Sequence, residues 1–220
     1  MLYGNQDEVA QLIGKIEFKD QWIHVVKGST WYQWAGTYWH QDLKAGGFDT
    51  IRKGLRTAIK RMNSWVKQML RNGGLSNKDQ EELESDARKA DFAKRAKHYI
   101  SDIYALVSKD DDYTIAPGAF DADPNHLGTP EGTVDLTIPD FISADPCHYI
   151  SRQTICAPAK GEPDRWLQFL DEIFAGDQGV IDFIQRLCGY ALTGQTREEK
   201  LFFLYGSGAN GKSKFLETLT

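Results

Sequence analysis

The sequence lacks the features that mark several classes of protein. It has three cysteines in 220 residues, Cys147, Cys156 and Cys188, with no Cys-x-x-Cys pair and no histidines at zinc-site spacing, so we expect reduced thiols. No stretch reaches the 18 apolar residues that a membrane-spanning helix needs, and no basic patch with an apolar run opens the chain. We therefore expect a folded, cytoplasmic protein without a membrane partner.

Acidic side chains are missing from residues 51–78, although the whole chain carries a formal net charge of −5. Cations that neutralise phosphates are the main source of affinity for nucleic acid. The alternative is a solvated helix face that meets an acidic neighbouring subunit, and the sequence does not decide between the two. In the first case the DNA-binding candidates are Arg52, Lys53, Arg56, Lys60 and Arg61, and the same segment also contains Lys67, Arg71 and Lys78.

Hydrophobic periodicity predicts a mainly helical α+β chain. Residues 7–16 predict a short helix. Residues 18–42 alternate apolar and polar side chains around two glycine turns, which predicts a small antiparallel sheet rich in Trp and Tyr. Such rings can stack on exposed bases, but we favour a miniature core.

Two long helices are predicted next. An apolar stripe at three- and four-residue spacing runs from residue 51 to the glycines at 73 and 74, and a second stripe runs from 83 to 107. Ser76 and Asp79 have capping-box spacing at the start of the second helix. All seven prolines fall within residues 110–165, which predicts irregular structure with short strands, the best of them at 133–136. Two further helices are predicted at 166–174 and 180–192.

One motif carries chemistry. Residues 201–205 (LFFLY) are continuously apolar, as in a strand buried within a parallel sheet. The next residues match the phosphate-binding pattern G-x-x-x-x-G-K-[ST]: Gly206, Ser207, Gly208, Ala209, Asn210, Gly211, Lys212 and Ser213. Backbone N–H groups of such a loop, with the following helix N-terminus, bind phosphate oxygens. We expect Lys212 to contact the β- and γ-phosphates of ATP and Ser213 to bind Mg²⁺, which makes these two residues the catalytic candidates.

Other polar groups are weaker candidates. The carboxylates of Asp110–Asp112, or of Asp121 with Asp123, can be imagined as a metal site, but they lie in turns where Asp is common for local hydrogen bonding. The five histidines are isolated in the sequence, so we interpret them as satisfied or surface residues: His24, His40, His98, His126 and His148.

Several segments resemble the phage and plasmid primase-helicases of helicase superfamily 3, which include satellite-phage and poxvirus-like members. The similarity is carried by GSTWYQWAGTYWHQD at 28–42, by FDADPNHLGTPEGTVDL at 120–136 and most specifically by the block 166–213. Local departures occur at 125–126, 131 and 137–139. The similarity covers nearly the whole chain.

The resemblance implies an ATP-driven, hexameric DNA helicase of the bacterial host cytoplasm that acts on single- or double-stranded DNA with a primase domain or protein. It divides the chain into an N-terminal helix and meander (1–45), a helical region with an irregular insert (46–195) and the truncated start of an AAA+-like P-loop domain (196–220). We recognise no second acidic Mg²⁺ ligand, sensor or arginine finger, so we expect little hydrolysis by this chain. The alternative is a non-enzymatic module for subunit assembly or for docking to primase and DNA.

Overall fold

The structure, a computed structural model, describes residues 5–138, 140–206, 208 and 210–219. The described residues form a mixed α+β chain, as predicted, and divide into two compact units, Met1–Phe120 and Asp121–Thr220. Each unit has a hydrophobic core of its own. None of the helices in the described ranges is long and apolar enough to cross a membrane.

The N-terminal unit begins with a helix and a small sheet. Helix α1 (Gln6–Ile13) continues directly into a π-helical turn (Gly14–Phe18). Strands β1 (Trp22–Val25), β2 (Thr30–Trp34) and β3 (Trp39–Gln41) then pair in antiparallel order. The predicted meander is therefore confirmed.

A fourth strand joins this sheet from far along the chain. Strand β4 (Thr114–Ile115) pairs in parallel with β1, with His24 opposite Thr114 and Val25 opposite Ile115, and the sheet order is β3-β2-β1-β4. Short strands were predicted within 110–165, but neither the position of this strand nor its pairing with β1 was predicted. A two-residue strand has no periodicity to detect, and its partner is distant in sequence.

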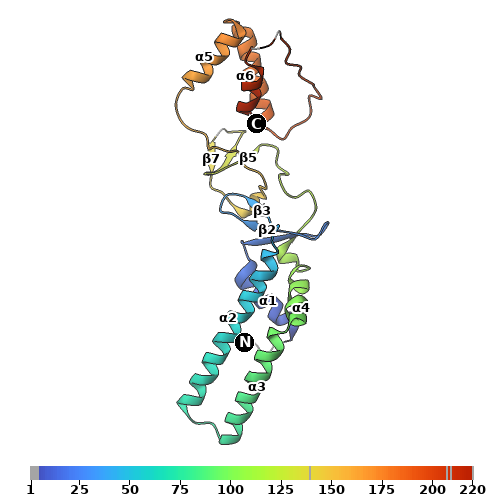
Figure 1. Ribbon diagram of the computed structural model, residues 1–220, viewed down its shortest axis with the longest axis vertical. Helices are drawn as coiled ribbons and strands as arrows, with labels where there is room; N and C mark the ends of the chain where they lie inside the picture. Colours follow the sequence, from blue (N-terminus) through green and yellow to red (C-terminus); the bar gives the residue numbers. More distant parts are fainter. Residues whose placement is uncertain (1–4, 139, 207, 209, 220) are drawn as a thin grey trace. The chain divides into compact units, whose positions relative to one another are not determined.

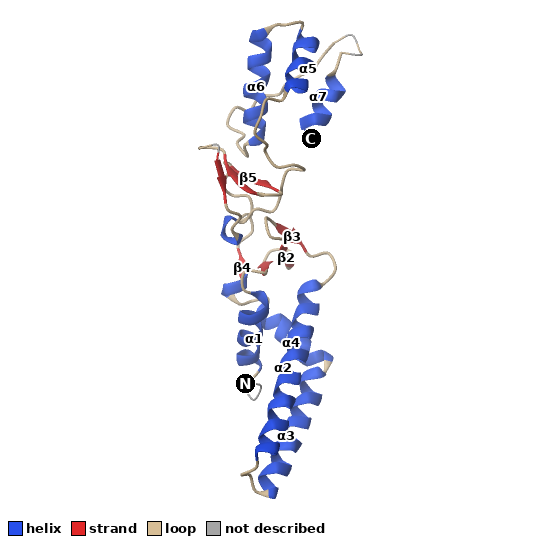
Figure 2. Cartoon of the chain, turned by 90° about the vertical axis from the view of Figure 1, so that its left-hand side faces the viewer, coloured by secondary structure: helices blue, strands red, loops and turns tan. Residues whose placement is uncertain are grey.

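The helical part of this unit contains α2 (Gly46–Asn72), α3 (Asn77–Arg95) and α4 (Lys97–Val107) (Figure 1). Helix α2 ends at Gly73, whose φ of 71° is in the left-handed region that glycine tolerates best. Ser76 caps α3, because its hydroxyl accepts a hydrogen bond from the Asp79 N–H at 3.3 Å. The predicted αα-hairpin is confirmed, and α1 lies beside α2 and α4 in both ribbon views (Figures 1 and 2).

The prediction of one long helix from 76 to 107 was wrong at a single point. Ala96 has an extended backbone, with ψ of 140°, and separates α3 from α4. No glycine or proline marks the break, and the apolar stripe continues across it, so periodicity alone could not show it. Both helices pack on α2, and the break turns the chain so that Ile100, Ile103 and Val107 of α4 are buried in the unit's core.

The core of this unit joins the meander to the helices. Phe18 is completely buried, and its ring contacts both Trp22 and Trp31. The meander, expected as part of a separate segment, thus shares one core with α2, and Trp22, Trp31 and Trp39 are all buried. The interpretation of the aromatic residues as a miniature core is confirmed for these three rings.

The described residues of the C-terminal unit form a three-stranded antiparallel sheet, a short 3-10 helix (Pro146–His148) and three α-helices. Strands β5 (His126–Thr129), β6 (Gly132–Asp135) and β7 (Asp140–Ile142) pair in that order, and β6 matches the strand predicted at 133–136. Helices α5 (Asp164–Phe174), α6 (Gln178–Leu192) and α7 (Lys212–Leu219) follow. The buried centre of the helical core is formed by Leu170, Ile184 and Phe215, one from each helix.

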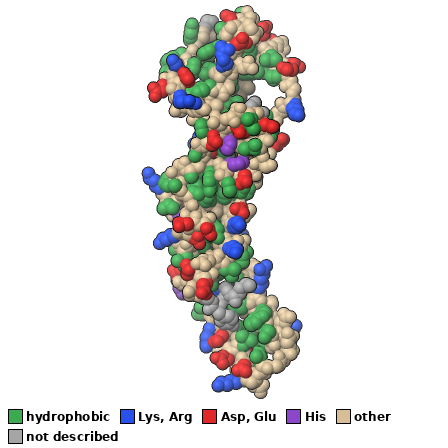
Figure 3. Space-filling view, turned by 180° about the vertical axis from the view of Figure 1, so that it is seen from behind, with side chains coloured by type: hydrophobic (Ala, Val, Ile, Leu, Met, Phe, Trp, Pro, Cys, Tyr) green, Lys and Arg blue, Asp and Glu red, His purple; other side chains and the backbone are tan. Residues whose placement is uncertain are grey.

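The strand predicted at 201–205 is not formed. These residues have no regular secondary structure, and Phe203 and Tyr205 are 80% and 91% exposed. A strand exists through hydrogen bonds to a neighbouring strand, and no described residue pairs with this segment. Its apolar side chains remain on the surface, and hydrophobic groups gather over this unit in the upper part of the space-filling view (Figure 3).

Candidate nucleotide-binding loop and basic helix face

Two glycines of the candidate loop have a backbone conformation that favours glycine. Gly208 and Gly211 have φ values of 102° and 80°, a region in which side-chain-bearing residues are strained. At Gly206 an added Cβ would lie 1.8 Å from the Asn210 side-chain nitrogen. Two of the predicted loop residues, Ser207 and Ala209, lie outside the described residues.

The Lys212 side chain, at the C-terminal end of the loop, bonds back to two earlier loop residues. Its ammonium group donates to the Asn210 side-chain oxygen at 2.6 Å and contacts the Gly206 carbonyl at 3.4 Å. Both acceptors are neutral and belong to the loop itself. The motif lysine is thus turned toward the loop's own backbone, and Asn210, at a position that the motif leaves open, holds it there.

The loop leads directly into α7. Lys212 is the first residue of this helix, and the Phe215 N–H donates to the Gly211 carbonyl at 2.9 Å. The first N–H groups of a helix have no acceptor within the helix, and the helix dipole is positive there. Ser213 is exposed in this first turn. The helix predicted after the loop is confirmed, and Lys212 and Ser213 lie in its first turn.

Helix α5 packs against the backbone of the loop. A Cβ added to Gly211 would lie 2.7 Å from Ile173 Cγ2 and 3.1 Å from the Phe169 ring, so the loop backbone is in close contact with α5. Phe215 is 4% exposed and stacks on Trp166, with ring centroids 5.8 Å apart. The sequence predicted separate helices for these residues, but it did not show that α7 packs on α5 through them.

A cavity of about 410 Å³ lies beside the loop. Its walls are apolar side chains of α5 and α6, residues 202–205 and Phe215, and its polar lining comes from Asn210 and Lys212. Clefts that are mostly apolar with a few converging polar groups are typical of small-molecule sites. The loop therefore borders an open, mostly apolar hollow, with Lys212 and Asn210 at its polar part.

The predicted DNA-binding residues divide into two groups. Arg52 and Lys53 both pair with Asp49, and the Lys53 ammonium lies 2.7 Å from that carboxylate. The hydrogen bond from Lys53, with a second from Arg52, lowers the pKa of Asp49. Their charge is thus partly neutralised by an acid that lies just outside the cation-rich segment.

The remaining cations of α2 are unpaired. Among the described residues no ion pair involves Arg56, Lys60, Lys67 or Arg71. These four are exposed, and their spacing of 4, 7 and 4 residues places them along one stripe of the helix. Arg61 lies off this stripe and lines a groove next to α1. The basic stripe is defined here as Arg56, Lys60, Lys67 and Arg71, of which the last two were not among the predicted contacts.

The acids of α3 do not neutralise the basic stripe. The ion pairs of α3 are internal, such as Glu84 with Arg88 and Asp86 with Lys89. Within the described ranges, no ion pair joins α2 to α3, and the Asn63 amide instead donates to Asp91 at 3.1 Å. The stripe is therefore open to a polyanion.

The interpretation of the other carboxylates as turn residues is confirmed for Asp110 and Asp123, which bond locally, whereas Asp121 bonds to a residue far along the chain. Asp110 accepts from the Asp112 N–H at 3.0 Å, Asp123 accepts from the Asn125 N–H at 2.9 Å, and Asp121 binds Ser151. No cluster of three or more metal-binding side chains occurs in the part of the chain that the structure describes.

Three histidines are less isolated than the sequence indicated. His126 and His148 lie with ring centroids 5.2 Å apart, and His126 Nε2 lies 3.8 Å from the Asp123 carboxylate. His24 is buried against Trp31, and its Nε2 lies 3.3 Å from the Ser29 hydroxyl. These partners were invisible in the sequence because turns and strand pairing bring them together.

The comparison with known families agrees with the resemblance in the sequence. No curated protein matches the chain. Residues 12–175 match the family described as D5 N terminal like, the N-terminal domain of D5-like primase-helicase proteins. The match covers well over half of the chain and ends at the C-cap of α5, so the candidate loop lies outside it. The chain therefore belongs to the D5 N terminal like family of replication-associated primase-helicase proteins.

Proposed function

We propose that this chain is part of an ATP-driven DNA helicase of superfamily 3, in which residues 206–213 bind ATP with Mg²⁺ and the basic stripe of α2 contacts DNA. The observation that carries the proposal is the position of Lys212. Its ammonium group lies inside a glycine loop, at the first residue of a helix, beside an open cavity.

The residues of the loop fit a triphosphate. Phosphate oxygens are charged, so their hydrogen bonds to an ammonium group are stronger than those of the neutral Gly206 and Asn210 oxygens. Lys212 would exchange these two acceptors for β- and γ-phosphate oxygens, and the first N–H groups of α7 would donate to the same anion. When bound, Mg²⁺ neutralises charge on those oxygens, and the exposed Ser213 hydroxyl would be one of its ligands.

The basic stripe supports the second part of the proposal. A helix rises about 1.5 Å per residue, so the fifteen-residue interval from Arg56 to Arg71 spans roughly 22 Å. Four unpaired cations over that length can neutralise several phosphates of one strand. By its resemblance to the family, the whole protein would assemble as a hexamer, couple ATP hydrolysis to unwinding and act with a primase.

A second candidate is a non-enzymatic module that docks DNA, a primase or neighbouring subunits. The family match favours it, because that match describes an N-terminal domain and ends before the loop. In this case α2 would still bind DNA, but residues 206–213 would bind no nucleotide.

Binding of a fluorescent ATP analogue with Mg²⁺ separates the two candidates. Lys212→Ala removes a charge-assisted hydrogen bond of about 1.5–3 kcal/mol, which corresponds to a loss of affinity of roughly tenfold to a hundredfold. Lys214→Ala is the matched control, because Lys214 lies on the same helix but is exposed and pairs with Glu217 at 2.7 Å. Equal binding by both variants and the unaltered chain would exclude the loop as the nucleotide site.

A further inference from the structure

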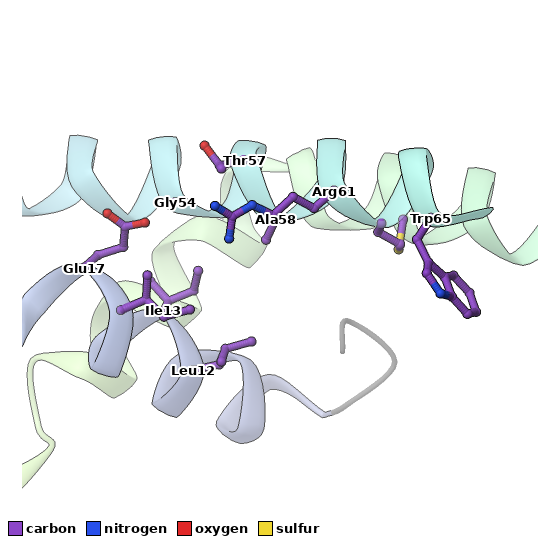
Figure 4. A pocket seen from close by; sticks show the side chains of 10 residues that line it. Leu12, Ile13, Glu17, Gly54, Thr57, Ala58, Arg61 and Trp65 are labelled. Carbon is purple, nitrogen blue, oxygen red and sulfur yellow. The ribbon is translucent and has the colours of Figure 1, made fainter. Parts of the chain in front are cut away.

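The hollow beside the loop and a larger hollow between α1 and α2 differ in their charged and polar lining. The larger one, of about 580 Å³, is bordered by one cation, Arg61, and one anion, Glu17 (Figure 4). This balanced lining selects no class of ligand. At the smaller hollow, Asn210 and Lys212 of the loop are hydrogen-bonded to each other. That bond bears directly on how a nucleotide would reach the lysine.

The Asn210 side chain extends across the loop from Lys212 toward Gly206. Its Oδ1 accepts a hydrogen bond from the Lys212 ammonium group at 2.6 Å. An ammonium group can only donate, so the carboxamide turns its oxygen to the lysine. Its nitrogen lies against the other end of the loop, where a Cβ added to Gly206 would be 1.8 Å away. One carboxamide thus connects the first residue of the motif with its lysine.

The acceptors of the Lys212 ammonium group are uncharged. Among the described residues no ion pair involves Lys212. The Gly206 carbonyl lies 3.4 Å from the ammonium nitrogen, so the bond to Asn210 is the shorter of the two. A neutral amide oxygen holds an ammonium group less strongly than a phosphate oxygen does. A phosphate can therefore replace the Asn210 oxygen, but it has to break this bond first.

Other contacts hold the loop backbone in place. Gly211 packs closely against Ile173 and Phe169 of α5, and its carbonyl accepts from the Phe215 N–H at 2.9 Å. These contacts fix the end of the loop and the start of α7 without the Asn210 side chain. The bond from Asn210 therefore acts on the position of the lysine charge more than on the shape of the loop.

We propose that the Asn210 carboxamide competes with the phosphates of a nucleotide for the Lys212 ammonium group and so lowers the affinity of the loop. The proposal rests on the nucleotide site proposed at residues 206–213. Asn210 is then a positioning residue that acts through Lys212. The apparent affinity for a ligand falls with the fraction of molecules in which its binding group is free. A nucleoside triphosphate displaces the carboxamide, whereas a monophosphate, which lacks the β- and γ-phosphates, leaves it bonded to the lysine.

The test measures the binding of fluorescent ATP and AMP analogues with Mg²⁺ to the whole chain and two variants. Asn210→Ala should bind the ATP analogue about threefold to tenfold more tightly, the worth of one hydrogen bond exchanged with water, and the AMP analogue equally well. Asn210→Asp keeps the size but pairs a carboxylate with Lys212, so ATP affinity should fall by about tenfold or more. A purely structural asparagine gives the opposite order, because Asp keeps its shape and Ala does not. Equal or weaker ATP binding by Asn210→Ala would overturn the proposal.

The double variant Lys212→Ala, Asn210→Ala shows whether Asn210 acts through the lysine. Two residues joined by one hydrogen bond give effects that do not add. In the Lys212→Ala chain, the further change of Asn210 should therefore alter ATP affinity by less than about twofold. The same gain with and without Lys212 would contradict the competition. Failure of the nucleotide site itself looks different: Lys212→Ala would then bind ATP as tightly as the unaltered chain, and the proposal would fall with the site.

NMR of the lysine ammonium groups tests the contact without any nucleotide. A half-buried, hydrogen-bonded ammonium group exchanges its protons with water more slowly than a free one does. We expect a resolved Lys212 signal, identified by its loss in Lys212→Ala, that broadens in Asn210→Ala. Lys214, which pairs with Glu217 at 2.7 Å, is the control and should be unchanged. A Lys212 signal that is equally sharp in Asn210→Ala would show that Asn210 does not hold the lysine, whether or not the loop binds ATP.

Discussion

The indole of Trp166 on α5 lies stacked on the ring of Phe215 on α7, with ring centroids 5.8 Å apart and planes inclined by 19°. Phe215 is three residues from Lys212, the first residue of α7. The stack therefore fixes the position of the helix N-terminus that the proposed phosphate site depends on.

Phe215→Ala should weaken the packing of α7 on α5. Removing a buried aromatic ring typically costs about 3–5 kcal/mol, and we expect the free energy of unfolding of the C-terminal unit to fall by that order. Phe215→Leu keeps most of the volume and should cost less, about 1.5 kcal/mol. Urea unfolding followed by tryptophan fluorescence, with binding of the ATP analogue, measures both effects. If Phe215→Ala binds nucleotide as well as the unaltered chain, α7 is not positioned by this contact.

Gly211→Ala tests the loop backbone. The φ of 80° and the contact of 2.7 Å that a Cβ would make with Ile173 both oppose a side chain at this position. Backbone strain of this kind costs on the order of 1–3 kcal/mol, and we expect nucleotide affinity to fall with stability. Gly189→Ala is the matched control, because a Cβ there meets nothing within 4 Å in the middle of α6. That control should be neutral or stabilise by about 0.5–1 kcal/mol; a similar loss in both variants would contradict the proposed conformation.

Charge reversal tests the basic stripe. The triple variant Arg56→Glu, Lys60→Glu, Lys67→Glu should weaken single-stranded DNA binding and make the dependence of log affinity on log salt shallower by about 2, at roughly 0.7 per phosphate contact. Fluorescence anisotropy of a labelled oligonucleotide at several salt concentrations gives this slope.

A second triple variant controls for net charge. Arg88→Glu, Lys89→Glu and Lys97→Glu change the formal charge equally but lie on α3 and α4. We expect this variant to lose less affinity and to keep its salt slope. Equal losses in the two triple variants would mean that α2 offers no specific path for DNA.

Acid should destabilise the N-terminal unit through His24. Burial lowers the pKa of His24, and a hydrogen bond with the Ser108 backbone only partly offsets this effect. Because the folded pKa lies below the unfolded value of 6.5, the unfolded chain takes up the proton first as the pH falls. The stability that depends on neutral His24 is therefore complete above pH 6.5 and is lost as the pH falls toward the folded pKa.

The midpoint of urea unfolding at pH 7.5 and at pH 5.5 measures this dependence. We expect His24→Gln to flatten the loss of stability between the two conditions. His98→Gln, at an exposed position on α4, should keep the full loss. The same pH dependence in all three proteins would rule out His24 as its source.

Local signals predicted most of the fold. Helix periodicity, the glycine turns and the Ser76 cap each depend on residues within one or two turns of one another, and the structure has all of them. The failures depend on distant or missing partners. Strand β4 exists only because β1 is beside it, and residues 201–205 have no strand beside them among the described residues. The break at Ala96 has no local signal, since the apolar stripe runs through it.

In the candidate site, too, features with a local sequence signal were predicted and features that depend on distant residues were not. The motif identified Lys212 and Ser213 from spacing alone, but it could not show that Asn210 holds the lysine or that Trp166 seats the helix. The sequence showed that α2 is rich in cations, but it did not show which of them are paired. Asp49 pairs with Arg52 and Lys53, and it lies one turn before them, outside the segment 51–78. Only the helix geometry separates the Lys67 and Arg71 side chains, which share the open face, from Arg61.

The parallel pairing of β1 with β4 allows the length of the α2–α3 hairpin to vary. Val25 and Ile115 hold together the two ends of a chain segment of about ninety residues, so the segment is closed at its base whatever its length. The entropy of closing a loop grows only with the logarithm of its length, and doubling the length adds about 0.6 kcal/mol. The hairpin can therefore be lengthened or shortened near the glycines at 73 and 74 without disturbing the sheet, which would change the length of α2 and α3.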